Sequence, residues 1–317
     1  MTFYVFKRIS QSLILLFLVS VTSFFLMHLA PGGPLAVYAR NPHITAHTLH
    51  VMEIRLGLNL PIWQQYVRWI NAWLHGQWGY SISSGLPVVA IITSHLGATG
   101  SLMLGGIIVA SVLGISIGTI GAVKRNTVFD YISSFFAYMV WAMPVFWLGY
   151  VLQLIFGIDL GWLPIAGQSN FSNPSLKSFV VHLILPSLTL GGVSAAGWSR
   201  YLRSSLVDVL HQDYIRTAKA KGLPPRRILL KHALRNAIIP LLTIIALDIP
   251  FFFSGAVLTE IVFSWPGVGR LFFDALQSQD YPVEISVIML TAMLIVLCNL
   301  AADLLYAVMD PRIQYEK

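Results

Sequence analysis

Charged residues and cysteine are both scarce in this sequence. Asp, Glu, Lys and Arg make up only 10% of the 317 residues, whereas soluble domains carry roughly 25%. Hydrophobic residues make up 56%, and the mean hydropathy is +0.73. The single cysteine, Cys298, excludes an intramolecular disulfide and a metal cluster built on cysteines. This composition predicts an integral membrane protein.

Common catalytic and nucleotide-binding motifs are also missing. The sequence contains neither the Gly-x-x-x-x-Gly-Lys-Ser/Thr pattern of an ATP-binding loop nor the His-Glu-x-x-His pattern of a zinc protease. We therefore assign no catalytic residue and no metal site. We expect that the chain is not an enzyme and that it binds no cofactor of its own.

Six apolar runs are each long enough for a membrane-spanning helix, which needs about 20 residues. They predict an all-α membrane protein with six transmembrane helices. The runs cover residues 9–30, 102–123, 129–156, 179–198, 237–258 and 285–308. The first run is too long for a signal peptide and lacks a good cleavage site, so we expect it to be an uncleaved anchor.

Basic residues predict the orientation of these helices, because Lys and Arg collect in cytoplasmic loops. A cytoplasmic N-terminus places fifteen of the twenty Lys and Arg residues inside, and the opposite orientation leaves five there. Both termini are then cytoplasmic. The same rule accounts for the net charge of +7, so we expect no nucleic-acid partner.

Residues 31–100, between the first two runs, are predicted to form an external subdomain. Thr45 is placed to cap one short helix, and a second begins near Pro61 with an aromatic face suited to the membrane interface or to packing on the other helices. Three histidines, His43, His47 and His50, are candidates for a metal-collecting patch. No cysteine or carboxylate joins them in the pattern, so we expect ordinary loop histidines.

The stretch 199–240 is too polar to cross a bilayer and holds nine of the twenty basic residues. Helical spacing of apolar residues predicts one helix that continues to about Lys221. Gly222 is expected to end it in a left-handed conformation. Pro224 and Pro225 then suit the start of a second helix, over residues 226–237.

Individual residues within the spans also invite interpretation. Pro144 is expected to kink the third helix, as a gate element or as a static bend. Asp248, halfway along the fifth run, either lines a translocation path or pairs with a polar group on a neighbouring helix. Glu260 is expected near the outer mouth, less buried. A stripe of small residues in the second run predicts close helix packing, at Gly106, Ala110, Gly114, Gly118 and Ala122.

Several separated motifs together resemble one family. They are Gly57-Leu58-Asn59-Leu60-Pro61, Asp213-Tyr214-Ile215-Arg216-Thr217-Ala218-Lys219-Ala220-Lys221-Gly222-Leu223, His232-Ala233-Leu234-Arg235-Asn236-Ala237 and Trp265-Pro266-Gly267-Val268-Gly269. They are similar to the permease subunits of binding-protein-dependent ABC importers, most of all the dipeptide and oligopeptide branch, which nickel permeases also resemble. The superfamily's Glu-Ala-Ala-x-x-x-Gly signature is only partly kept, because Arg216 stands where the glutamate would be.

The resemblance implies a transport role and a set of partners. The chain would be a permease subunit that pairs with a second, homologous permease, two ATPase subunits that hold ATP and magnesium, and an external solute-binding protein. The cargo would be dipeptides or oligopeptides, with nickel, glutathione or another small solute as alternatives and a passive channel as a distant one. The location would be a bacterial or archaeal cell membrane, the inner membrane in a Gram-negative organism.

The resemblance also implies roles for residues and segments. The predicted divisions are 1–30 for the first span, 31–100 for the external subdomain, 101–309 for the core permease domain and 310–317 for a cytoplasmic tail. The external docking candidates are Trp265, Pro266, Gly267 and Arg270, and the translocation-path candidates are Asp248 and Pro144. The candidates for coupling to the ATPase lie in the loop 199–240 and are Asp213, Tyr214, Arg216, Thr217, Ala218, Lys221, Gly222, Leu223, Pro224 and Pro225.

Overall fold

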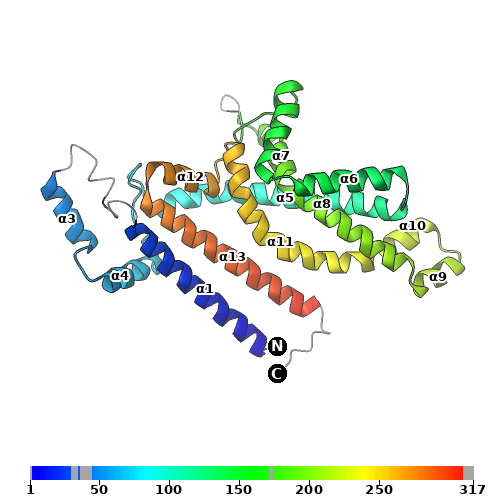
Figure 1. Ribbon diagram of the computed structural model, residues 1–317, viewed down its shortest axis with the longest axis horizontal. Coiled ribbons are helices and arrows are strands. Elements are labelled where there is room, and N and C mark those ends of the chain that lie inside the picture. The colour runs from blue at the N-terminus through cyan, green and yellow to red at the C-terminus, as the bar shows by residue number, and fades with distance from the viewer. Residues whose placement is uncertain (1, 30–34, 36–44, 171–173, 310–317) are drawn as a thin grey trace. The chain divides into compact units, whose positions relative to one another are not determined.

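The computed structural model describes residues 2–29, 35, 45–170 and 174–309. These residues form helices joined by loops of varied length (Figure 1), and apart from an isolated bridge between Tyr80 and Pro87 they contain no β-structure. The helices are α1 (Thr2–Leu29), α3 (Ala46–Leu56), α4 (Ile62–Leu74), α5 (Val88–Val123), α6 (Val128–Ala142), α7 (Val145–Leu152), the π-helical η2 (Gln153–Asp159), α8 (Leu176–Leu210), α9 (Asp213–Ala220), α10 (Pro225–Arg227), the π-helical η3 (Ile228–Ala233), α11 (Leu234–Val262), α12 (Val268–Ser278) and α13 (Tyr281–Met309).

The predicted all-α fold is confirmed for the described residues, with five to six candidate membrane spans. Five stretches are long and apolar enough to cross a membrane as single helices, and a bent pair of helices makes a sixth when the pair is counted as one span. The single stretches are Phe6–Leu26, Val88–Val123, Leu176–Leu210, Pro225–Val262 and Tyr281–Asp303. Each contains the core of one predicted apolar run, because a continuous hydrophobic stretch of this length is stable in lipid only as a helix.

The third span is broken rather than kinked at Pro144, which corrects the prediction. α6 ends at Ala142 and α7 begins at Val145, and the two helices are bent by 114°. Met143 and Pro144 have extended backbones, with ψ of 137° and 138°. Proline lacks an N–H group and disfavours a helical residue before it, so the helix stops instead of bending.

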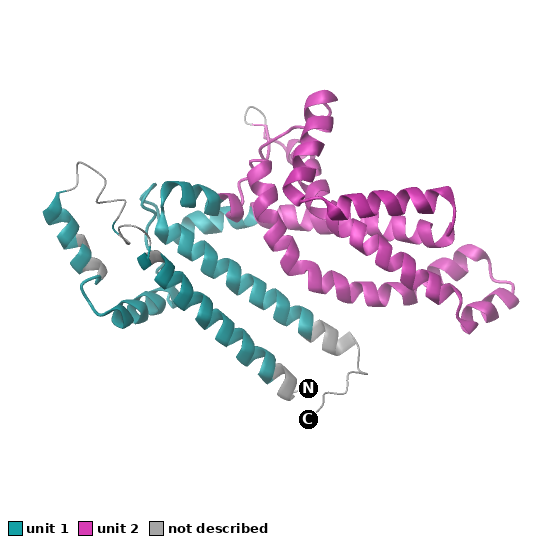
Figure 2. Ribbon diagram, viewed as in Figure 1, with its two compact units in different colours: residues 1–97, 271–317 teal, residues 98–270 magenta. Residues whose placement is uncertain are grey.

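The chain divides into two compact units (Figure 2), which cover residues 1–97 with 271–317 and residues 98–270. In the first unit, which we call unit 1, α1 packs along α13. An ion pair joins the two helices, with Arg8 Nε 3.3 Å from Asp303 Oδ2. α4 rests on α1 through Tyr66, whose hydroxyl lies 2.7 Å from Ser20 Oγ and whose ring packs against Phe24. The aromatic face predicted for α4 thus packs in part on the first span.

Short-range signals in residues 45–62 are confirmed. The Thr45 side chain caps α3 by accepting a hydrogen bond from the Thr48 N–H at 3.2 Å. Gly57 ends the helix with φ of +70°, and α4 begins directly after Pro61. A side-chain oxygen before a helix and a left-handed glycine after it satisfy backbone groups that the helix leaves unpaired.

The predicted histidine patch falls only partly within the described residues. His43 lies outside them, as do residues 36–42 and the predicted tail 310–317. His47 and His50 lie on α3 with exposed side chains, and His50 Nδ1 is 3.4 Å from the Glu53 carboxylate. A carboxylate therefore does join this patch. Across the described part of the chain, no three His, Cys, Asp or Glu side chains come together as a metal site.

The second unit, unit 2, contains residues 98–270 and has its core around α8. Trp198, Leu202 and Leu206 of α8 are almost fully buried, and Phe252 of α11 packs against the Trp198 ring. The small-residue stripe of α5 lets α8 approach closely, because a Cβ atom at Gly118 would lie 2.6 Å from the Ser199 carbonyl oxygen. Helix contacts this close predict a core that tolerates little added volume.

Candidate functional site

The polar stretch 199–240 folds into a short helix held at the end of two long ones. α8 runs without interruption from Leu176 to Leu210, and the eight-residue α9 follows after a two-residue break. On α9, Ile215 and Ala218 are 0% and 7% exposed and belong to the core of unit 2. The neighbouring Arg216 and Thr217 are exposed. α9 therefore has one face fixed to its own chain and one face open.

The continuous helix predicted to Lys221 is wrong at His211 and Gln212. Gln212 has an extended backbone with φ of −70° and ψ of 150°, and Asp213 begins α9. A negative side chain in the first turn favours a new helix start. The break also lets α9 take its own direction, so that Ile215 and Ala218 reach the core. This packing depends on tertiary contacts, which the spacing of apolar residues along the sequence does not reveal.

The predicted second helix, 226–237, is also longer than expected. The helical path begins at Pro225, passes through η3 and continues as α11 to Val262. η3 is one turn of π-helix, a variant that often occurs at functional sites. α9 is therefore connected to the fifth span by continuous helix from Pro225 onward.

Gly222 has the predicted left-handed conformation, with φ of +73°. Its N–H donates to the Lys219 carbonyl oxygen at 3.0 Å, and the Leu223 N–H donates to that of Ala218 at 3.3 Å. A Cβ atom at position 222 would meet nothing within 4 Å. Within this chain, Gly222 serves the turn, and close approach to the rest of the chain does not require it. Pro224 follows in an extended conformation before Pro225.

The coupling candidates separate into an outward and an inward group. Ala218 is buried, so it packs on its own chain and cannot belong to the open face. Tyr214 is 43% exposed, and its hydroxyl accepts a hydrogen bond of 3.0 Å from Asn236 Nδ2 of α11. Leu223 is half-buried. The candidates with exposed side chains are Asp213, Tyr214, Arg216, Thr217, Lys221, Pro224 and Pro225.

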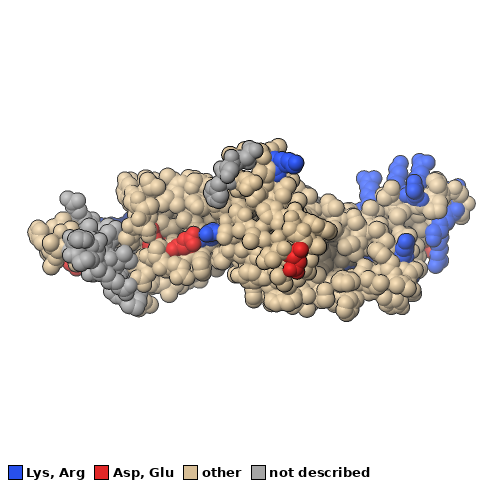
Figure 3. Space-filling model, turned by 90° about the horizontal axis from the view of Figure 1, so that it is seen from above, with Lys and Arg blue, Asp and Glu red and all other residues tan. Residues whose placement is uncertain are grey.

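The open surface around α9 is basic. Figure 3 shows Lys and Arg side chains gathered over the part of unit 2 that contains α9 and α10. Arg216, Lys219, Lys221, Arg226 and Arg227 are all exposed there. The one short-range ion pair, Arg216 to Asp213 at 3.5 Å, is itself exposed and contributes little to stability.

An ion pair that the sequence did not suggest joins α8 to α6. Arg203 donates from Nε to Asp130 Oδ1 at 2.5 Å and from a terminal nitrogen to Oδ2 at 2.6 Å, and the Asn126 N–H donates to Oδ2 at 2.9 Å. The Asp130 side chain is 4% exposed. One turn away, the Arg200 guanidinium lies 3.9 Å from the Tyr138 ring centroid. α6 is thus fastened to the end of α8 that leads to α9.

Asp248 is paired with a neighbouring helix. Trp198 Nε1 of α8 donates to Asp248 Oδ2 at 2.6 Å, and the Asp248 side chain is partly buried. This is the second of the two alternatives that the sequence left open. A hydrogen bond from an indole satisfies the carboxylate at membrane depth, where an unpaired charge is expensive.

Glu260 is fully buried, which corrects the expectation of a more exposed site. Its carboxylate accepts from Thr99 Oγ1 at 2.6 Å, from the Gly269 N–H at 2.7 Å and from the Arg270 N–H at 3.1 Å. A Cβ atom at Gly267 would overlap the Glu260 carboxylate. The Glu260 carboxylate therefore holds the loop between α11 and α12 in place. Position 267 requires glycine, because the carboxylate occupies the space that a side chain would need.

This loop offers less docking surface than the sequence suggested. Trp265 is 0% exposed, and its Nε1 donates to the Ala98 carbonyl oxygen at 2.8 Å. Gly267 is buried as well, whereas Pro266 is exposed and Arg270 is half-buried. Trp265 and Gly267 shape the loop from inside. A docking role stays a prediction for Pro266 and Arg270.

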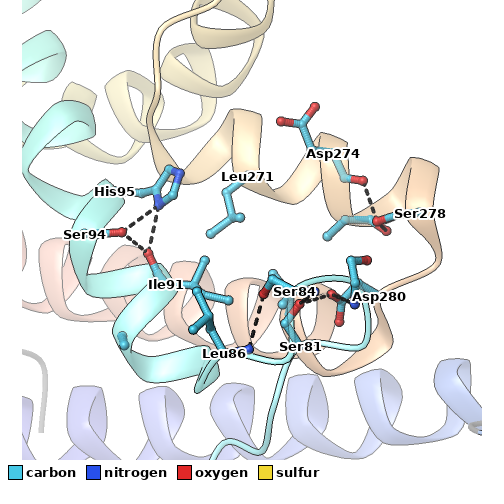
Figure 4. A pocket seen from close by; sticks show the side chains of 14 residues that line it. Ser81, Ser84, Leu86, Ile91, Ser94, His95, Leu271, Asp274, Ser278 and Asp280 are labelled. Carbon is cyan, nitrogen blue, oxygen red and sulfur yellow. Dashed lines mark hydrogen bonds between the residues drawn. The ribbon is translucent and has the colours of Figure 1, made fainter.

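A cavity of about 420 Å³ lies in unit 1 between the start of α5, α12 and the loop 81–86 (Figure 4). The Asp280 carboxylate faces the cavity, but its oxygens already accept hydrogen bonds from within the chain. They accept from Ser81 Oγ at 2.5 Å and from the N–H groups of Ile82 and Ser83 at 3.1 Å each. His95 on the opposite wall has its Nδ1 2.8 Å from the Ile91 carbonyl oxygen. These polar groups hold the backbone in place.

Comparison with known proteins gives the class of the chain. Residues 110–315 match the family described as binding-protein-dependent transport system inner membrane component, and residues 1–103 match the N-terminal part described for such a membrane component. The chain belongs to this family. It is a multi-pass permease subunit of an ABC importer in the cell membrane, as the resemblance implied.

Relatives of the permease are similar over nearly the whole chain. It is 39% identical to the oligopeptide transport system permease protein AppB of Bacillus subtilis, over 99% of this chain and 100% of AppB. Against proteins of Escherichia coli K12 it is 38% identical to the dipeptide transport system permease protein DppB, over 94% and 95% of the two chains, and 39% identical to the glutathione transport system permease protein GsiC, over 99% of each.

A solved structure with the same fold is an inward-facing form of the MetNI methionine ABC transporter. Its matching chain aligns with a TM-score of 0.56 and 14% identity, and the alignment covers 71% of the permease and 98% of that chain. At this identity the likeness concerns the fold alone. It agrees with the helical membrane architecture that the permease shows by itself.

Proposed function

We propose that this permease carries short peptides inward and that its α9 transmits the work of separate ATPase subunits. The observation that supports the coupling proposal is that α9 has one buried face and one exposed face. Ile215 and Ala218 bury one face in unit 2, and the other face is exposed and basic. A short helix held in this way moves together with the helices behind it when a partner pushes on its open face.

Two connections can carry such a movement from α9 into unit 2. α8 is continuous helix from Leu210 back to Leu176, and α11 is reached from Pro225 by continuous helix. The Arg203–Asp130 pair adds α6 to the moving group. A displacement of α9 therefore reaches α6, α8 and α11 together.

The proposed partners follow from what the chain holds. We assign ATP and magnesium to two separate ATPase subunits, because the sequence contains no ATP-binding loop. A second, homologous permease completes the path, and an external solute-binding protein delivers the cargo. In this assembly, the basic stretch with α9 and both termini lie in the cytoplasm, as the distribution of fifteen of twenty basic residues favours.

The cargo proposal rests on the relatives. AppB and DppB are described as oligopeptide and dipeptide permeases, and they match this chain over nearly its full length. GsiC, described as a glutathione permease, matches equally well and makes glutathione, itself a small peptide, the second candidate.

Uptake into vesicles tests the proposal. The permease is reconstituted with its partner permease, ATPases and binding protein, and labelled dipeptides, oligopeptides and glutathione are offered with and without ATP. We expect ATP-dependent peptide uptake. Uptake by this chain alone without ATP would contradict the importer mechanism, and uptake of nickel but of no peptide would contradict the cargo.

The coupling role has its own variant. Gly222→Trp places a bulky side chain beside the open face of α9. A Cβ atom there would meet nothing within 4 Å, so we expect assembly to survive and uptake to fall at least tenfold. Gly161→Trp is the matched control, because Gly161 is also exposed and left-handed, with φ of +63°, and its Cβ would meet nothing within 4 Å, so both variants carry the same kind of backbone strain. Equal uptake by both variants would refute coupling through α9.

A further inference from the structure

The largest cavity described in unit 1 has no role in the proposed transport mechanism. It measures about 1050 Å³ and lies between the end of α1, α4, the loop 76–82 and the first turn of α13. Its volume is at the upper end of the range for small-molecule sites. Its lining is strongly aromatic, with the rings of Phe24, Trp69, Trp78, Tyr80 and Tyr281.

The cavity has a basic side chain in its lining. Arg68 of α4 lines it, and the described residues around it include no Asp or Glu. Arg68 is exposed, and within the described ranges no carboxylate comes within ion-pair distance of its guanidinium. A guanidinium offers five N–H donors in a planar fork that suits phosphate and carboxylate groups.

His28 of α1 also lines the cavity, and both of its ring nitrogens have partners within the chain. Its Nδ1 lies 2.9 Å from the Phe24 carbonyl oxygen and its Nε2 lies 2.9 Å from Gln65 Oε1. The orientation of the Gln65 amide is fixed, because its Nε2 donates to the carbonyl oxygens of Leu58 and Leu60 at 2.9 and 2.8 Å. The His28 ring is thus fixed in position at the cavity wall, where it also packs against the Phe24 ring.

The cavity lies at the level where the apolar spans end. The span of α1 stops at Leu26, two residues before His28, and the span of α13 begins at Tyr281. α1 and α13 pack together, and the Arg8–Asp303 pair joins their other ends. Tryptophan and tyrosine collect at this depth, where the hydrocarbon meets the headgroups.

The surroundings favour an occupant that comes from the membrane. Within unit 1, α1 packs against α13 and α4, and large apolar side chains on its remaining surface stay exposed: Leu13 62%, Ile14 60% and Phe17 57%. Such a surface suits lipid chains. α1 continues from this surface to Phe24 and His28, which line the cavity.

From this geometry we infer that the cavity binds an anionic phospholipid. The phosphate group lies at the Arg68 guanidinium, and an acyl chain packs on the apolar lining, which includes Phe24 and Ile285. Aromatic rings at the headgroup level hold the glycerol region. The bound lipid fastens α4 to the ends of α1 and α13, and it does so whatever cargo the transporter carries.

Photocrosslinking tests this inference on the assembled transporter in nanodiscs. Phosphatidylglycerol with a diazirine on one acyl chain is the probe, and the same reagent with a phosphatidylcholine headgroup is the neutral reference. We expect crosslinks to the lining residues of α1, α4 and α13 that are at least fivefold stronger with phosphatidylglycerol. Equal labelling by the two lipids would overturn the inference.

Variants at Arg68 sharpen the test. Arg68→Gln should lower labelling of the cavity by phosphatidylglycerol roughly fivefold, because one basic group near the phosphate is lost. Arg68→Lys should keep most of it, and Lys177→Gln, which removes an exposed charge from unit 2, should have no effect. Unchanged labelling of Arg68→Gln would refute the site. Displacement of the lipid by millimolar inorganic phosphate would also refute it, since the site would then be one for free phosphate.

Discussion

Replacement of Arg203 by glutamine should destabilise the permease, because it removes one partner of a mostly buried ion pair. Arg203 supplies two of the three hydrogen bonds that the Asp130 carboxylate accepts, at 2.5 and 2.6 Å. In Arg203→Gln, Asp130 stays 4% exposed and keeps the Asn126 N–H as its remaining donor. The loss of one partner from a buried pair leaves an uncompensated charge in a medium that solvates it poorly.

The size of the effect follows from the unequal burial of the two partners. Breaking a buried ion pair costs roughly 3–5 kcal/mol, and the Arg203 side chain is 31% exposed, so we expect about 3 kcal/mol for Arg203→Gln. Asp130→Asn should cost less, about 1.5 kcal/mol, because the guanidinium left behind can turn toward water. The double variant should cost less than the sum of the two, since the residues share one interaction.

Unfolding by denaturant in mixed micelles, followed through helical circular dichroism, measures these differences. Arg200→Gln is the control, because Arg200 lies one turn away on α8 and contacts Tyr138 through a cation–π interaction worth about 1 kcal/mol. The reasoning is refuted when Arg203→Gln is no more destabilising than Arg200→Gln. It is also refuted when Asp130→Asn costs as much as Arg203→Gln.

Two further predictions concern buried carboxylates. Glu260→Gln should loosen the loop around Gly269, because an amide cannot accept hydrogen bonds from Thr99 and two backbone N–H groups as a carboxylate does. Hydrogen exchange at the Gly269 N–H should rise at least tenfold. Unchanged exchange would contradict the role of the charge. Asp248→Asn should keep ATP-dependent uptake within about threefold, because Asn still accepts from Trp198 Nε1, whereas complete loss of uptake in an assembled variant would show that the charge itself is needed.

Features set by neighbouring residues in the sequence were predictable. The six spans follow from hydropathy alone, since lipid leaves the backbone few alternatives to a helix. The Thr45 cap and the left-handed Gly57 and Gly222 follow from preferences that act within a few residues. The same preferences predict the turn at Gly222 that follows α9, but not the separate start of α9 at Asp213.

Features set by contacts between distant segments were not predictable. Asp130 and Arg203 are 73 residues apart, and nothing in either local pattern points to the other. Glu260 stands near the end of an apolar run, which suggested exposure, yet Thr99 and the loop after α11 enclose it. Ala218 was placed on the partner surface from its motif, although packing in unit 2 turns it inward.

The break at Met143 and Pro144 limits what can surround the third span. At this break the Val140 carbonyl oxygen accepts from the Met143 N–H at 3.2 Å, and the Leu148 N–H donates to the Pro144 carbonyl oxygen at 3.1 Å. A helix end leaves other carbonyl and N–H groups without partners in their own helix, and acyl chains offer none. Irregular backbone at this depth persists only against protein or in a wetted recess. We therefore expect one side of the break between α6 and α7 to be shielded from the hydrocarbon in the working transporter, by a neighbouring chain or by water. Lipid can then reach only the remaining sides.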